Sequence, residues 1–120
     1  MSYLFSQTSI KEIDLSKFNT SLVTNMAYMF DSCHDLISLE LSSFDTSNVK
    51  FMNGMFQYCN KLISLDITNF NTKNVLSISN IFHNMEELVS IGLSKFDTTK
   101  VTDLSGLFNR CEKISINRSF

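Results

Sequence analysis

Proline and tryptophan are absent from this sequence of 120 residues, and Ala27 is the only alanine. The chain also lacks any apolar run of about eighteen residues, which is the length that a membrane-spanning helix requires. Its first twenty residues have neither the basic start nor the continuous apolar stretch of a secretion signal. We therefore expect no membrane insertion, and the sequence as it stands shows no export signal or anchor.

Clusters of basic residues are missing as well. The chain carries 10 Lys and Arg against 12 Asp and Glu, which gives a net charge of -2. Binding through the phosphate backbone needs a concentrated basic surface, so nucleic acid is not an expected partner. A hydrophobic fraction of 43% with 18% charged residues excludes a disordered tail, a collagen-like rod and a low-complexity linker.

Phenylalanine, in contrast, is abundant and regularly spaced. Its 11 copies include two sets at intervals of 26 residues, and Thr and Val recur at the same interval. This period divides a single repeat domain, residues 1–120, into a partial unit at 1–9, full units at 10–35, 36–61, 62–87 and 88–113, and a partial unit at 114–120. The sets are Phe18, Phe44, Phe70 and Phe96; Phe30, Phe56, Phe82 and Phe108; Thr20, Thr46, Thr72 and Thr98; and Val23, Val49, Val75 and Val101.

Each unit has two halves with different hydrophobic periods. In the second unit, the alternation of LISLELSSF predicts a strand, with Ile37, Leu39 and Leu41 on one side and Ser38, Glu40 and Ser42 on the other. The following VKFMNGMFQYC predicts a short helix whose apolar face holds Val49, Met52, Met55, Phe56 and Cys59. Neither half buries its apolar side alone, so we expect units to stack with equivalent residues in contact and with both Phe sets forming aromatic rows.

The wording of the units resembles a known family. LISLELSSFDTSNVKFMNGMFQYCNK is similar to the BspA-like leucine-rich repeats of bacterial and protist surface proteins, also met in mycoplasma lipoproteins. Together with the periods, the resemblance implies an α/β fold: a right-handed leucine-rich-repeat solenoid with a parallel sheet on the concave face and short helices on the convex face. It also implies a non-enzymatic adhesion protein at the cell surface or secreted. Without a signal or anchor, this chain would be a fragment of such a protein or cytoplasmic.

The cysteines and histidines do not form a predicted reactive site. Cys33, Cys59 and Cys111 occupy one repeat position, where the third unit has Met85, so we interpret them as buried apolar residues with free thiols. A disulfide between Cys33 and Cys59 remains an alternative. His34 and His83 fall at different repeat positions with no paired nucleophile, and we therefore expect no catalysis, no metal and no cofactor.

Charged positions follow the repeat in three different ways. Asp35, Lys61, Glu87 and Lys113 alternate in sign, which predicts ion pairs between units, and Asn19, Asp45, Asn71 and Asp97 alternate between neutral and negative. Asp14, Glu40 and Asp66, by contrast, are three acids in successive units, where like charges should repel. This acidic row, flanked by Ser38, Ser42, Ser64 and Thr68, is a candidate surface for a basic partner or a cation. The alternative is that the three carboxylates are simply solvated.

Isolated aromatic residues supply the second candidate surface. Tyr28, Phe51 and Tyr58 stand at repeat positions that are otherwise small or polar, so we expect them on the outside as anchors for a partner protein. The predicted function is protein binding. The alternative is a structural role in which the chain associates with itself through the open ends of the solenoid.

Overall fold

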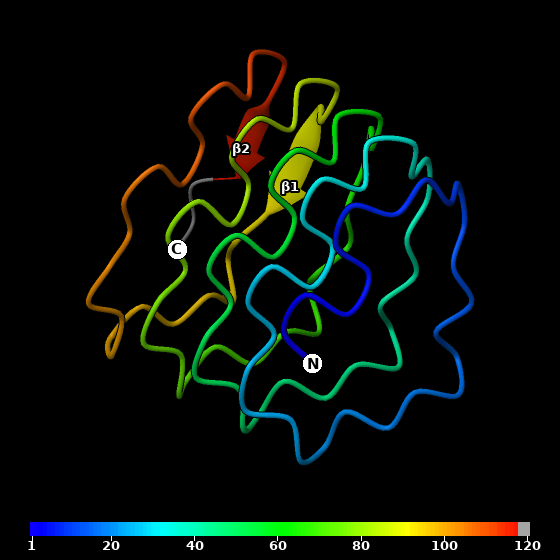
Figure 1. The fold of residues 1–120 in the computed structure, drawn as a ribbon. Helices are drawn as coiled ribbons and strands as arrows, with labels where there is room; N and C mark the ends of the chain where they lie inside the picture. The colour runs from blue at the N-terminus through cyan, green and yellow to red at the C-terminus, as the bar shows by residue number, and fades with distance from the viewer. Residues whose placement is uncertain (118–120) are drawn as a thin grey trace.

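The computed structural model describes residues 1–117, and successive turns of the chain lie side by side from the N-terminal to the C-terminal part (Figure 1). Regular secondary structure within these residues is limited to strands β1 (Ser90–Gly92) and β2 (Ser115–Asn117), which pair in parallel. No helix forms among the described residues. The predicted α/β leucine-rich-repeat solenoid, with a concave sheet and convex helices, is therefore wrong.

Contacts between residues one repeat apart hold the chain together instead. We call each 26-residue unit a layer. Isolated parallel bridges join Asn25 to Phe51, Phe51 to Ser77 and Ser77 to Asp103 across four layers, and another bridge joins Ser64 to Ser90. The interval is 25 residues, one fewer, where β1 pairs with β2 through Ile91 and Ile116, and where Phe5 of the N-terminal partial unit stacks on Phe30. Residues 118–120 of the last partial unit lie outside the described residues.

The segments predicted to be helical are runs of overlapping turns. Their backbone enters the left-handed region at two positions four residues apart in each layer, which a right-handed helix cannot tolerate. The residues with positive φ include Tyr28 and Ser32, Gly54 and Tyr58, Asn80 and Asn84, and Gly106 and Arg110. Overlapping turns also return a side chain to the same face every three or four residues, so the apolar spacing is helix-like although the backbone is not.

Backbone N–H groups in these turns alternate between two kinds of partner. The N–H of Asp31 donates to the carbonyl of Tyr28 in the same layer, at 3.1 Å. The N–H groups of Tyr28 and Phe30 donate to the carbonyls of Asn53 and Met55 in the next layer, at 3.0 and 2.9 Å. Because every second donor bonds outside its own layer, a single layer cannot satisfy its own backbone.

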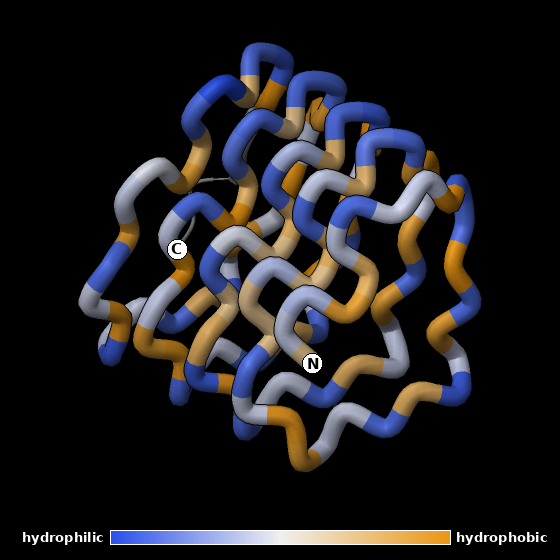
Figure 2. The backbone as a smooth tube through the Cα atoms, viewed as in Figure 1, coloured by the Kyte–Doolittle hydropathy of each residue, from blue (hydrophilic) through white to orange (hydrophobic). Residues whose placement is uncertain are grey.

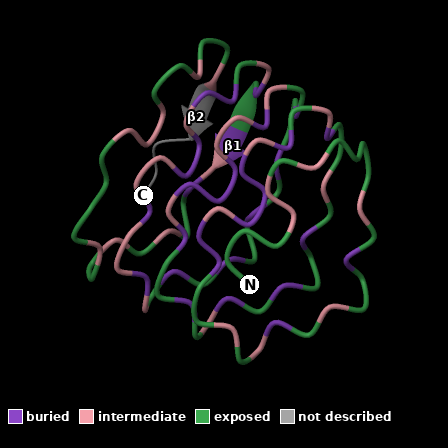
Figure 3. Cartoon of the chain, viewed as in Figure 1, coloured by how far each residue is buried: buried purple, intermediate pink, exposed green. Residues whose placement is uncertain are grey.

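The core is a set of apolar rows that run through the layers. Figure 2 shows apolar segments recurring at corresponding places in successive turns, and Figure 3 shows buried residues at the same places. The ring contacts predicted for the Phe30 set are confirmed, since Phe30, Phe56 and Phe82 are fully buried and stack within 13° of parallel along a row that includes Phe5 and Phe108. Their ring centroids are separated by 5.6, 5.8, 6.3 and 5.4 Å from Phe5 to Phe108.

A second row joins the layers through buried threonine hydroxyls. The hydroxyl of Thr46 donates to the carbonyl of Asn71 at 3.0 Å and accepts from the N–H of the same residue at 2.8 Å. We call this pair of bonds the threonine clamp. The clamp occurs three times, between Thr20 and Asp45, Thr46 and Asn71, and Thr72 and Asp97. Each hydroxyl thus satisfies a backbone donor and a backbone acceptor of the following layer.

Candidate protein-binding surfaces

The first half of each layer places its side chains differently from the simple alternation predicted. Leu36 is fully buried, Leu39 is half-buried and Leu41 is buried, whereas Ile37 is exposed. The prediction that Ile37 faces inward with Leu39 and Leu41 is wrong. Leu36 and Leu41 lie five positions apart and are both buried, which strict alternation does not allow, so this segment departs from a regular strand.

In three layers the first apolar residue of a pair such as Leu36 and Ile37 is buried and the second is exposed. The exposed residues form a row of aliphatic side chains, which we call the aliphatic row. It consists of Ile37, Ile63 and Val89, with exposed fractions of 52%, 59% and 47%. The N–H of Val89 donates to the carbonyl of Ile63 at 2.9 Å, so these two residues are direct neighbours. Three exposed aliphatic side chains thus occupy the same repeat position in successive layers.

The acidic row lies on the same outer stretch of the layers. Asp14, Glu40 and Asp66 are exposed, and each carboxylate accepts the backbone N–H of the residue two positions later, at 3.0, 2.8 and 3.0 Å. These bonds are local turn caps. The acidic residues therefore have a structural role that the sequence did not suggest, while their outward oxygens stay accessible.

The turn caps keep the acidic row charged. The pKa values of Asp14, Glu40 and Asp66 are lowered, because the hydroxyl and then the N–H of the residue two positions on stabilise the carboxylate. The negative charge of Asp66 acts in the opposite sense on the pKa of Glu40, which is the like-charge repulsion expected from their stacking. The row is thus anionic at neutral pH.

Hydroxyl side chains border both rows. Ser38, Ser42, Ser64 and Thr68 are all exposed. The backbone N–H groups of Ser42 and Thr68 cap Glu40 and Asp66, and the Thr68 hydroxyl adds a 2.7 Å bond to Asp66. The outer stretch of segments 36–42 and 62–68 therefore carries aliphatic, hydroxyl and acidic groups together.

The three predicted aromatic anchors differ in how far they are exposed. Phe51 is exposed by 39%, but Tyr28 and Tyr58 are half-buried. The Tyr28 ring stacks on Tyr3 at 4.9 Å, and it covers the space where Gly54 lacks a Cβ. Tyr58 meets His83 edge-on at 5.2 Å.

The cysteines are free, as predicted, with Cys33 and Cys59 buried and Cys111 half-buried. Their thiols donate to carbonyls of the preceding layer, at 3.1 Å for Cys33 and 3.2 Å for Cys59. Burial raises the pKa of the Cys111 thiol. Within residues 1–117, no group of His, Cys, Asp and Glu has the arrangement of a metal site, and no helix is long and apolar enough to cross a membrane.

The predicted ion pairs between layers occur at two places. Lys61 Nζ lies 3.0 Å from Asp35, and Lys113 Nζ lies 2.8 Å from Glu87. All four side chains are about half exposed, so each pair adds only a few tenths of a kcal/mol to stability. Their effect is mainly to favour one order of the layers.

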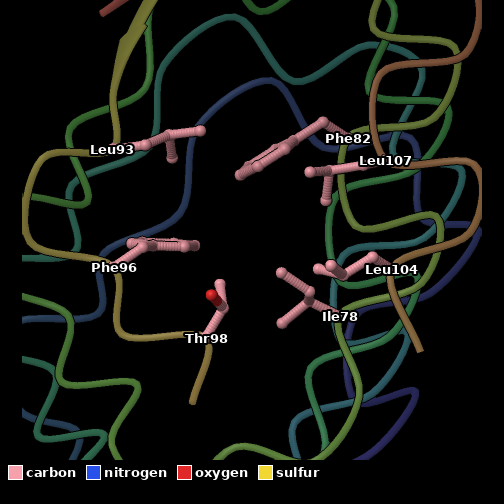
Figure 4. A pocket seen from close by; sticks show the side chains of 7 residues that line it. All are labelled: Ile78, Phe82, Leu93, Phe96, Thr98, Leu104 and Leu107. Carbon is pink, nitrogen blue, oxygen red and sulfur yellow. The ribbon is translucent and has the colours of Figure 1, made fainter. Parts of the chain in front are cut away.

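An apolar cleft of about 220 Å³ opens beside the last full layer. Figure 4 shows Leu93, Phe96 and Thr98 on one wall, facing side chains from the second halves of the last two full layers. The Thr98 hydroxyl is the polar group of a lining that is otherwise apolar. The lining residues are Ile78, Phe82, Leu93, Phe96, Thr98, Leu104 and Leu107.

A family model described as "Mycoplasma protein of unknown function, DUF285" matches residues 1–119. The chain belongs to this family. No curated protein and no solved structure matches the DUF285 chain. The resemblance to BspA-like repeats stays a prediction.

Two surfaces of this DUF285 chain were missed by sequence reasoning. The aliphatic row had a signal, because adjacent apolar residues at 36–37, 62–63 and 88–89 cannot all face the core of an extended segment. The cleft had a weaker signal, since its lining combines residues from the first and second halves of two layers. Individual residue types do not reveal such a cavity.

Proposed function

We propose that this DUF285 chain is a non-enzymatic protein-binding module of a surface protein, and that it contacts its partner through the aliphatic row. The exposure of Ile37, Ile63 and Val89 in successive layers carries this proposal. A row of this kind loses water-exposed apolar area on binding, which is the main favourable contribution to protein association. Rigid hydrogen bonding between the layers reduces the ordering cost of that contact.

The acidic row specifies the chemistry of the partner. It follows the aliphatic row by three residues in two layers, from Ile37 to Glu40 and from Ile63 to Asp66, which is about 10 Å in an extended chain. A partner with an apolar patch bordered by Lys or Arg would match both rows. The carboxylates would contribute orientation and association rate more than affinity, because they are exposed.

Two further considerations support a binding role. Repetition offers similar side chains in every layer instead of one coordinated set of catalytic groups. The resemblance to BspA-like repeats supports a cell-surface location and adhesion to host proteins.

A binding experiment with surface variants tests the proposal. The triple variant Ile37→Ser, Ile63→Ser, Val89→Ser removes the row while leaving the core intact, and it should lose capture by surface plasmon resonance on an array of purified extracellular proteins. Leu22→Ser is the matched control, because Leu22 is 87% exposed and lies outside the row. Equal binding by the triple variant and the unmodified protein would refute the proposed surface.

A second candidate function is assembly through the faces of the end layers. Phe18 and Val23 in the first full layer and Phe96 and Val101 in the last are half-buried, whereas Phe44 and Val49 between them are buried. Association of such faces would complete their burial. Light scattering across a range of concentrations tests this, since an assembling chain increases in molar mass and a binding module stays monomeric.

A further inference from the structure

The cleft beside the last full layer displays the same groups that join the layers elsewhere. Phe96 and Thr98 occupy the same repeat positions as Phe70 and Thr72. The Thr72 hydroxyl forms a threonine clamp with the backbone of Asp97, with hydrogen bonds of 2.7 and 3.1 Å. Thr98, by contrast, has no hydrogen-bond partner for its hydroxyl among residues 1–117. Within the described residues, its donor and acceptor are therefore unpaired at one wall of an apolar cleft (Figure 4).

The clamp in the body of the protein defines what such a hydroxyl binds. In all three occurrences it takes the N–H and the carbonyl of one residue of the next layer. In all three, that residue directly follows a Phe: Phe44 before Asp45, Phe70 before Asn71 and Phe96 before Asp97. Backbone clamping next to a Phe is thus the established interface of this fold.

We propose that the cleft binds an extended segment of another polypeptide that carries a Phe followed by a residue whose backbone pairs with Thr98. The Phe side chain would enter the apolar cleft between Phe96 and Leu107, and Thr98 would hold the next residue as Thr72 holds Asp97. This inference deepens the proposed protein-binding function, on which it rests. It adds a second site, separate from the aliphatic row, that recognises main chain and one aromatic side chain.

Charge selects the residue that follows the Phe. Within the protein, the residue after each Phe alternates between Asn and Asp: Asn19, Asp45, Asn71 and Asp97. A residue bound by Thr98 would take the next place in this set and would therefore lie next to Asp97. A second carboxylate there would be repelled, because like charges on adjacent strands destabilise the pair. The cleft should therefore prefer Phe-Asn-Thr to Phe-Asp-Thr, and the preference should weaken as salt is added.

Peptide binding to the full chain tests the inference. The probe is a fluorescent peptide with the sequence KFNTSLV, which occurs at residues 17–23, and the measurement is fluorescence anisotropy. We expect saturable binding, weakened about 10- to 100-fold when Phe in the peptide becomes Ala. The Asn-to-Asp peptide should bind about threefold more weakly at low salt.

Protein variants locate the binding. Thr98→Val should weaken binding about five- to tenfold through loss of the clamp, and Leu104→Ser should weaken it by removing part of the cleft wall. The triple variant of the aliphatic row should bind the peptide normally, so a failure of the cleft is distinguishable from a failure of the proposed function. Equal binding of the Phe and Ala peptides would overturn the inference. Dimerisation that depends on Leu104, with no peptide binding, would assign the cleft to a second copy and also overturn it.

Discussion

Replacing Thr46 with Val should reveal how much a threonine clamp contributes to stability. Val has nearly the shape of Thr but lacks the hydroxyl, so the substitution removes the two bonds to Asn71 without opening a cavity. Thr46 is only 2% exposed, which keeps water from replacing the hydroxyl on that side. The substitution therefore tests the clamp more directly than a truncation would.

The magnitude follows from the two backbone groups that lose their partner. An unpaired buried backbone group costs about 1 to 3 kcal/mol. Asn71 is exposed, so water partly satisfies its N–H and carbonyl, and we expect Thr46→Val to lower the free energy of unfolding by about 2 to 3 kcal/mol. With a urea dependence of about 1 to 3 kcal/mol per molar, the unfolding midpoint should fall by roughly 0.7 to 3 M.

Urea unfolding followed by circular dichroism measures this change against two controls. Thr46→Ser keeps the hydroxyl and should lose only about 1 kcal/mol for the missing methyl group. Thr98→Val makes the same chemical change where the hydroxyl has no partner among the described residues, and it should shift stability by less than about 0.5 kcal/mol. Equal midpoints for Thr46→Val and Thr98→Val would refute the clamp as a source of stability.

Three other predictions concern the turns and the thiols. Gly54→Ala should destabilise the protein by more than about 1 kcal/mol in the same urea assay, because φ is +63° and a Cβ would collide with the Tyr28 ring; Gly92→Ala, with open space around it, should be nearly neutral. Hydrogen bonds donated by the residue two positions later lower the pKa of Asp45 below its ordinary value. The ionised carboxylate of Asp45 therefore stabilises the folded protein fully above about pH 4, and this stabilisation is lost as the pH falls through the pKa of the folded state. Asp45→Asn should reduce this acid sensitivity of the thermal midpoint, and an unchanged pH profile would contradict the assignment. In native protein a thiol reagent should modify Cys111 first, since the other two cysteines are buried; simultaneous modification of all three would show that the core opens readily.

The sequence predicted which residues meet but not the backbone that brings them together. A spacing of 26 residues was sufficient to predict the stacked row of Phe30, Phe56 and Phe82, because identical units can share a core only if equivalent positions are adjacent. The apolar stripe from Val49 to Cys59 was also correct as a description of what is buried. It failed as a prediction of helix because overlapping turns have nearly the same side-chain period.

The distinguishing signal lay in a different set of residues. Gly54, Asn80 and Gly106 occupy one repeat position, and these are the residue types that enter the left-handed region at the lowest cost. In the first full layer the same position holds Tyr28, so the preference for Gly or Asn at this position is not evident in every layer. The threonine clamps could not be predicted, since a recurring Thr does not indicate which backbone group its hydroxyl will meet.

The alternating sign of charge at one repeat position restricts how such a chain can change in length during evolution. Asp35 pairs with Lys61, and Glu87 pairs with Lys113, so deletion of residues 36–61 alone would place Asp35 against Glu87. Loss of residues 36–87 would instead place Asp35 against Lys113 and keep opposite charges together. Duplication and deletion by recombination should therefore be better tolerated in steps of two units than of one.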